Sequence, residues 1–136
     1  MVLTMTGKDI DKKVVEIKEL TDSLIEAMTE KEMDDIDMAA MMSILVLMST
    51  LREIFTGSRD DSFITDNFAK MDNKQFSRLF ERMLRARNNI REELERRSKG
   101  EKRGCGFENT DDQILEHCRD RMDEFLKMAE NGHRVF

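Results

Sequence analysis

The most apolar part of the chain is residues 36–55, in which no charged residue occurs between Met38 and Leu51. The polar residues inside this run are two serines and a threonine, whose short side chains can hydrogen-bond to the preceding turn of a helix. A helix that is apolar on nearly every side is typical of a buried element. We therefore predict that residues 36–55 form a central helix around which the rest of the chain packs.

Apolar residues elsewhere recur at alternating intervals of three and four, the spacing of one face of a helix. Gly57 is placed to end the central helix and Gly132 to end the last one, because glycine tolerates the left-handed conformation found after a helix. Further helices are predicted at about residues 8–28, 62–71, 73–99 and 110–131.

The composition favours the same fold class. The chain has no proline, tryptophan or tyrosine, whereas it has 6 glycines and 12 methionines. Strands and their turns usually draw on β-branched and aromatic residues, glycine and proline. Its 136 residues suffice for one hydrophobic core. We predict a single all-α domain over residues 1–136, a compact bundle of about five helices with the first, fourth and fifth packed around the central one.

Two neighbouring segments are expected to be exposed. The apolar seam of the fourth helix thins in its second half to Ile90 and Leu94 among charged residues. That half is predicted to project into solvent or to be covered by another subunit. Residues 99–110 contain three glycines and are predicted to form a mobile loop.

The central helix is so apolar that a bundle of this size is expected to leave one of its faces uncovered. An uncovered apolar face is most simply buried by another copy of the same chain. We therefore predict a homodimer or a higher oligomer.

The cellular compartment is inferred from what the chain lacks. The uncharged run is shorter than the ~20 residues that a membrane-spanning helix needs. The first residues show no basic start followed by an apolar stretch, as a secretory signal would. Cys105 and Cys118 are too few for a disulfide scaffold. We expect a cytoplasmic protein with no membrane partner and with both thiols reduced.

Charge is unevenly distributed along the chain. Residues 78–103 contain ten Lys or Arg against five Glu, a balance of +5, which leaves −11 for the rest of a chain of net charge −6. Arginine predominates there, and its planar fork binds carboxylate and phosphate alike. The candidate contact residues for a protein partner or for nucleic acid are Arg78, Arg82, Arg85, Arg91, Arg96, Arg97, Lys99, Lys102 and Arg103. A solvated helix face with local ion pairs accounts for the same pattern.

No motif points to catalysis or to a bound metal. Cys105, His117, Cys118 and His133 lack the paired spacing of a zinc site. The acidic residues of the last two helices do not match the spacing of the all-α nucleotide pyrophosphohydrolases, and no nucleophile motif or phosphate-binding loop is present. We predict no cofactor, no metal, no small-molecule substrate and no enzymatic activity.

These observations lead to two hypotheses about function. The first is a non-enzymatic helical binding protein, such as an adaptor, subunit or inhibitor, that occupies or bridges a macromolecular surface as a homo-oligomer. The alternative is a nucleic-acid-binding protein, or a subunit of a nucleoprotein complex, that uses the basic helix of residues 78–103.

Overall fold

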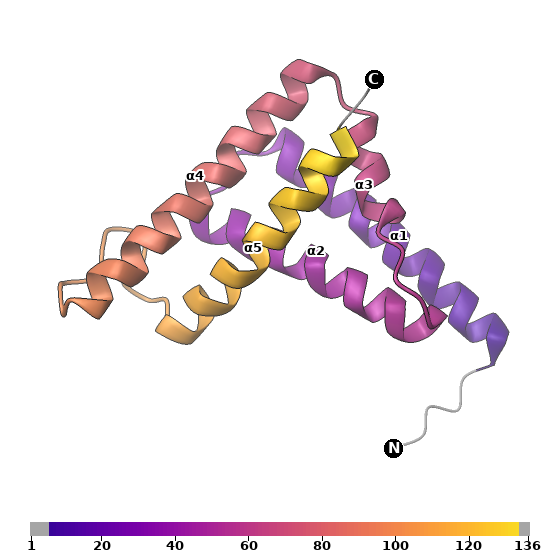
Figure 1. The fold of residues 1–136 in the computed structure, drawn as a ribbon, viewed down its shortest axis with the longest axis horizontal. Coiled ribbons are helices and arrows are strands. Elements are labelled where there is room, and N and C mark those ends of the chain that lie inside the picture. Colours follow the sequence, from indigo (N-terminus) through magenta and orange to yellow (C-terminus); the bar gives the residue numbers. More distant parts are fainter. Residues whose placement is uncertain (1–5, 134–136) are drawn as a thin grey trace.

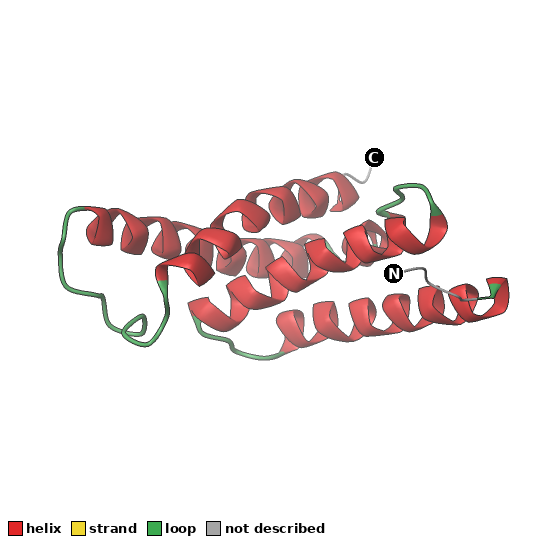
Figure 2. Ribbon diagram, turned by 90° about the horizontal axis from the view of Figure 1, so that it is seen from below, coloured by secondary structure: helices red, strands yellow, loops and turns green. Residues whose placement is uncertain are grey.

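The protein is an all-α bundle of five helices, as predicted. The fold is described from a computed structural model, and the structure describes residues 6–133. Within that range no strand is present (Figures 1 and 2). The helices are α1 (Gly7–Glu30), α2 (Asp35–Thr56), α3 (Ser62–Ala69), α4 (Asn73–Ser98) and α5 (Asp112–His133).

Helix α2 is the central helix, and its bounds agree with the sequence pattern to within a residue. The Asp34 side chain caps its start by accepting a hydrogen bond from the backbone N–H of Asp37. Gly57 ends it with a φ of 81°, in the left-handed region that glycine adopts without strain. It packs against α1, α4 and α5. The residues that it buries are Met38, Ala39, Met42, Ser43, Leu45, Val46 and Ser49.

Helix α1 lies beside α2, to which residues 31–34 connect it (Figure 2). Thr6 and Asp9 form a reciprocal capping box that satisfies backbone N–H groups at its start. Its buried residues Ile17, Ile25 and Met28 recur at helical spacing, so a single seam faces the bundle. This packing agrees with the predicted arrangement of the first helix on the central one.

An aromatic cluster joins α3, α4 and α5 at one end of the bundle. Phe68 of α3 meets the rings of Phe76 and Phe125 edge-on, with centroid separations of 6.2 and 5.6 Å. Such edge-to-face pairs add to the stabilisation that burial of the rings supplies. The cluster therefore ties the short helix α3 to the two long helices beside it.

Helix α5 does not end at Gly132, and that prediction is wrong. The helix continues through Gly132 to His133, the last residue that the structure describes. A Cβ atom at Gly132 would lie 2.5 Å from the carbonyl oxygen of Thr65 in α3. His133 then contacts the Phe68 carbonyl oxygen through Nδ1 at 3.0 Å and Asn73 Oδ1 through Nε2 at 2.9 Å. Glycine is needed here for a close approach of two helices.

The second half of α4 does not project into solvent, and its apolar seam is covered within the chain and not by another subunit. Ile90 is 1 % exposed and Glu93 is fully buried. Helix α5 packs along α4, and Phe107 from the loop that joins the two helices is also buried in the core. The prediction overlooked that the following loop and helix fold back over a thin apolar seam.

Candidate functional site

The nine basic residues predicted to contact a partner divide into two groups. Six bond to other groups of the chain, namely Arg82, Arg91, Arg96, Arg97, Lys99 and Arg103. For Arg78, Arg85 and Lys102, no hydrogen bond or ion pair is found among residues 6–133. Much of the basic segment therefore stabilises the fold.

Arg97 and Glu93 form a buried ion pair at the end of α4. The Arg97 side chain is only 7 % exposed, and the Glu93 side chain is fully buried. Arg97 Nε donates to Glu93 Oε2 at 2.7 Å, while Arg97 Nη1 donates to Asp112 Oδ1 at 2.7 Å. Arg96 Nη2 donates to the other oxygen of Glu93 at 2.7 Å. Both oxygens of the buried carboxylate are thus satisfied.

The same pair holds the loop between α4 and α5. Arg97 donates to the backbone carbonyl oxygens of Phe107 and Thr110 at 2.7 and 2.6 Å, and the Gly104 N–H donates to Glu93 Oε1 at 2.9 Å. A Cβ at Gly104 would lie 2.8 Å from that carboxylate oxygen, so glycine permits the contact. The loop is anchored at three points along its length, and mobility of its exposed residues stays a prediction.

Burial and hydrogen bonding act in opposite directions on the pKa of Glu93. Burial alone would raise it, but the donors from Arg96, Arg97 and the Gly104 N–H outweigh burial and hold the pKa below its ordinary value. The carboxylate therefore contributes stability above the pKa of an unfolded glutamate, about 4.3, and this contribution is lost as the pH falls through the lower native value.

We therefore expect the wild-type protein to be more stable than Glu93→Gln at neutral pH, with the difference shrinking below about pH 4.3. Urea unfolding of both proteins at several pH values measures this difference in the free energy of unfolding. A stability difference that stays constant between pH 7 and the acid range would contradict the assigned pKa direction.

Arg91 and its neighbour Arg87 join α4 to α5. Arg87 Nη1 donates to Asp123 Oδ1 at 3.1 Å, and Arg91 Nη2 donates to Asp123 Oδ2 at 2.6 Å. One carboxylate thus receives two guanidinium groups from successive turns of α4. Arg91 was predicted to meet a partner, and the structure places it in this intramolecular contact.

The Arg82 side chain caps the C-terminal end of α1. Its Nη1 donates to the Met28 carbonyl oxygen at 2.9 Å, and its Nη2 donates to the Lys31 carbonyl oxygen at 2.6 Å. Carbonyl groups at a helix C-terminus lack partners within the helix and carry partial negative charge. Arg82 satisfies two acceptors there and is fixed in place.

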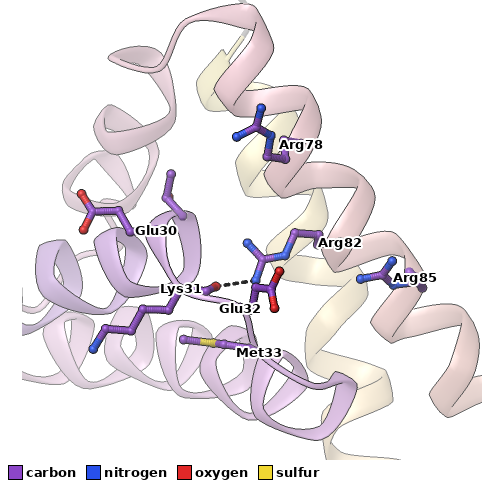
Figure 3. Close-up of a pocket in the computed structure, with 8 residues that line it drawn as sticks. Glu30, Lys31, Glu32, Met33, Arg78, Arg82 and Arg85 are labelled. Atoms are coloured by element: carbon purple, nitrogen blue, oxygen red, sulfur yellow. Dashed lines mark hydrogen bonds between the residues drawn. The ribbon is translucent and has the colours of Figure 1, made fainter.

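Arg78 and Arg85 stand one turn to either side of Arg82, and the three project from α4 toward the segment joining α1 and α2 (Figure 3). Between these elements lies a half-open pocket of about 560 Å³, which we call the arginine groove. Its lining residues are Thr29, Glu30, Lys31, Glu32, Met33, Arg78, Arg82 and Arg85. Four cationic and two anionic side chains line it, a balance of +2. An anionic ligand of limited length fits this charge better than a neutral one.

A second surface is formed by the part of α2 that the bundle leaves uncovered. Ile44, Leu47, Leu51 and Ile54 are exposed, and their spacing of three, four and three residues puts them on one face of the helix. We call these four residues the apolar stripe. The sequence indicated that some face of this helix would be uncovered, but its apolar residues did not reveal which one.

The four residues considered as metal ligands do not form a site. Among the residues that the structure describes, no group of three or more His, Cys, Asp or Glu side chains is arranged to hold a metal ion. His133 bonds to α3 and α4, Cys118 is buried, and Cys105 is exposed. Burial raises the pKa of the Cys118 thiol.

Helix α2 is long and apolar enough to cross a membrane by length and composition, the one such helix within residues 6–133. The core helix of a folded domain meets the same criteria. In this protein α2 packs against α1, α4 and α5, and its buried residues belong to the core they share.

Comparison with models of protein families, with curated proteins and with solved structures finds no match to this chain.

Proposed function

We propose that this protein is a non-enzymatic helical binding protein whose arginine groove receives an acidic segment of a partner protein. The observation that most supports this is the pair Arg78 and Arg85. Both stand at the groove, on either side of the fixed Arg82, and neither has a bonding partner among the described residues. The planar fork of a guanidinium group matches the two oxygens of a carboxylate.

The fixed position of Arg82 favours binding at this place. A guanidinium group has five N–H donors, and the carbonyl groups of Met28 and Lys31 accept from two of its nitrogens, so donors remain for a ligand. A side chain that is already held loses less conformational entropy when it binds. Arg82 therefore serves as a rigid centre, and Arg78 and Arg85 as adjustable arms.

A protein partner fits the groove better than nucleic acid does. Glu30 and Glu32 line the same groove, and a continuous phosphate backbone would approach both carboxylates. An acidic polypeptide can space its carboxylates to avoid them. The net charge of −6 opposes the approach of any polyanion over long range, and it does so more strongly for the dense charge of a nucleic acid than for a short acidic segment.

The bridging part of the proposal rests on self-association. The apolar stripe is separate from the arginine groove, because α2 carries the stripe whereas α4 and residues 29–33 line the groove. A homo-oligomer formed through the stripe presents one groove per copy. Such an assembly can join two acidic segments, as an adaptor or an inhibitory subunit would.

The test uses a fluorescent peptide rich in Glu and Asp, and fluorescence anisotropy as the readout at low and moderate salt. We expect the wild-type chain to bind it, and Arg78→Glu/Arg85→Glu to bind it at least about tenfold more weakly, because two attractive charges become repulsive. Binding should weaken as salt rises. The charge-matched control is Lys12→Glu/Lys127→Glu, both exposed and outside the groove, which should bind within about twofold of wild type.

Two results would overturn the proposal. One is equal loss of binding in the two double variants, which would indicate a response to net charge alone. The other is tighter binding to single- or double-stranded oligonucleotides than to the peptide, with a steep salt dependence, which would support the nucleic-acid alternative.

A further inference from the structure

The apolar stripe on α2 has the same pattern of residues when it is read in either direction along the chain. Its four residues read Ile, Leu, Leu, Ile from Ile44 to Ile54, with Leu47 and Leu51 between them. Both the residue types and the intervals of three, four and three are the same in either direction along the chain. An apolar seam at alternating spacings of three and four is the pattern through which one helix packs lengthwise on another.

We propose that the apolar stripe binds the apolar stripe of a second copy of this chain, with the two α2 helices antiparallel about a two-fold axis. This rests on the homo-oligomeric assembly proposed above and specifies its interface. In such a pairing Ile44 lies opposite the partner's Ile54, and Leu47 lies opposite the partner's Leu51. A two-fold interface brings the same patch of both copies together, and a stripe that reads identically in both directions meets that requirement with like residues matched in size.

The shape of the surface around the stripe supports this register. At the Ile44 end, α2 and α5 border a hollow of about 310 Å³ in which Ala40 and Ser43 present small side chains and Ile114 stands at the side. The other end of the stripe lies ten residues, or about 15 Å, along the helix. Ile54 stands there and is 65 % exposed, more than any other large apolar side chain among residues 6–133. The antiparallel pairing brings each Ile54 to the hollow of the other copy.

The apolar area that the stripe exposes is comparable to the apolar part of a standard interface. The four stripe residues with Ile114 expose on the order of 400 Å², within the range of apolar patches that serve as interaction sites. A standard interface buries about 800 Å² per partner, of which somewhat more than half is apolar. The stripe therefore supplies most of the apolar centre, and the polar residues along its edges supply the rim.

The interface is tested by sedimentation, which measures the oligomeric state of the full wild-type chain and of its Leu47→Glu variant. We expect the wild type to be a dimer, and Leu47→Glu to be a monomer with unchanged helical circular dichroism, because a charge in the seam would be buried in the dimer alone. The matched control is Leu20→Glu. Leu20 lies on α1 and is about as exposed as Leu47, so this variant should stay dimeric. A wild-type chain that is monomeric up to millimolar concentration would overturn the proposal.

Disulfide cross-linking tests the orientation. Ile44→Cys and Ile54→Cys are made separately in a Cys105→Ser background, because Cys105 is an exposed thiol. After mild oxidation, we expect a cross-linked dimer when the two variants are mixed and little when either is alone, since identical positions lie about 15 Å apart along antiparallel helices. Cross-linking of each variant with itself would show parallel helices and overturn the register.

The remaining outcomes are also distinct. A monomer that floats with neutral lipid vesicles would assign the stripe to a membrane surface and overturn the dimer. Peptide binding at the arginine groove is measured on other residues, so a dimer without peptide binding contradicts the proposed partner alone. Peptide binding by a monomer contradicts the interface alone.

Discussion

Arg97→Ala is expected to lower the free energy of unfolding by about 3 kcal/mol, because it removes the more deeply buried of the two guanidinium groups that pair with the Glu93 carboxylate and leaves Glu93 Oε2 without its donor. Glu93 is fully buried, and Arg97 is nearly so. The substitution also removes the donors to the carbonyl oxygens of Phe107 and Thr110, which hold the loop before α5. Urea denaturation followed by circular dichroism measures the loss.

The matched control is Arg96→Ala. Arg96 donates to the same carboxylate, but its side chain is 39 % exposed, so its removal admits water to the other side of the pair. We expect it to cost no more than about 1 kcal/mol, as for exposed ion pairs. Equal losses for Arg96→Ala and Arg97→Ala would show that burial of the pair does not determine its contribution.

A double-mutant cycle separates the buried charge from the loop contacts. Adding Glu93→Gln to Arg97→Ala removes the buried charge that Arg97→Ala leaves incompletely paired, so we expect the double variant to lose less than the sum of the two single losses. The loss of stability that Arg97→Ala still causes in the Glu93→Gln background measures the contribution of the hydrogen bonds from Arg97 to the loop. Strict additivity of the two losses would mean that the two side chains do not interact.

Gly132→Ala is expected to destabilise the protein by about 1–3 kcal/mol, the usual cost of overpacking. The new Cβ would lie 2.5 Å from the carbonyl oxygen of Thr65 and 3.0 Å from its Cβ, so α5 must move away from α3. Intrinsic helix propensity alone would favour alanine over glycine by about 1 kcal/mol. The two effects have opposite signs, and a backbone atom at this distance cannot move aside as a flexible side chain does.

Gly7→Ala is the control for this prediction. Gly7 is the first residue of α1, and nothing lies within 4 Å of the position where its Cβ would be. We expect Gly7→Ala to be neutral or slightly stabilising in the same urea titration. Stabilisation by Gly132→Ala would show that α3 and α5 are not in close contact at this point.

The positions of the helices were predictable because their signals are local. Asp72 and Gln75, three residues apart, form a reciprocal capping box at the start of α4, and Gly57 ends α2 through its own backbone conformation. The seam of Ile17, Ile25 and Met28 likewise depends only on the 3.6-residue period of its own helix. Each of these features is settled by residues a few positions apart.

The roles of the arginines were not predictable, since their partners lie far away along the chain. Arg82 bonds to carbonyl groups 51 and 54 residues earlier, and Arg91 to a carboxylate 32 residues later. A pattern of charge on α4 is the same whether the side chains face solvent, a partner or another helix. Only the packing of α4 against α1 and α5 distinguishes the arginines of the fold from those left at the groove.

The sequence by itself determined the all-α class, the number and approximate extents of the helices, and α2 as the central one, because helix formation and apolar periodicity are properties of short segments. The tertiary structure decided which face of α2 is uncovered, that Glu93 is buried, and that Gly132 is a contact point within a helix. Those three features arise where segments distant in the sequence meet, and the geometry of that meeting is set by how the five helices pack together.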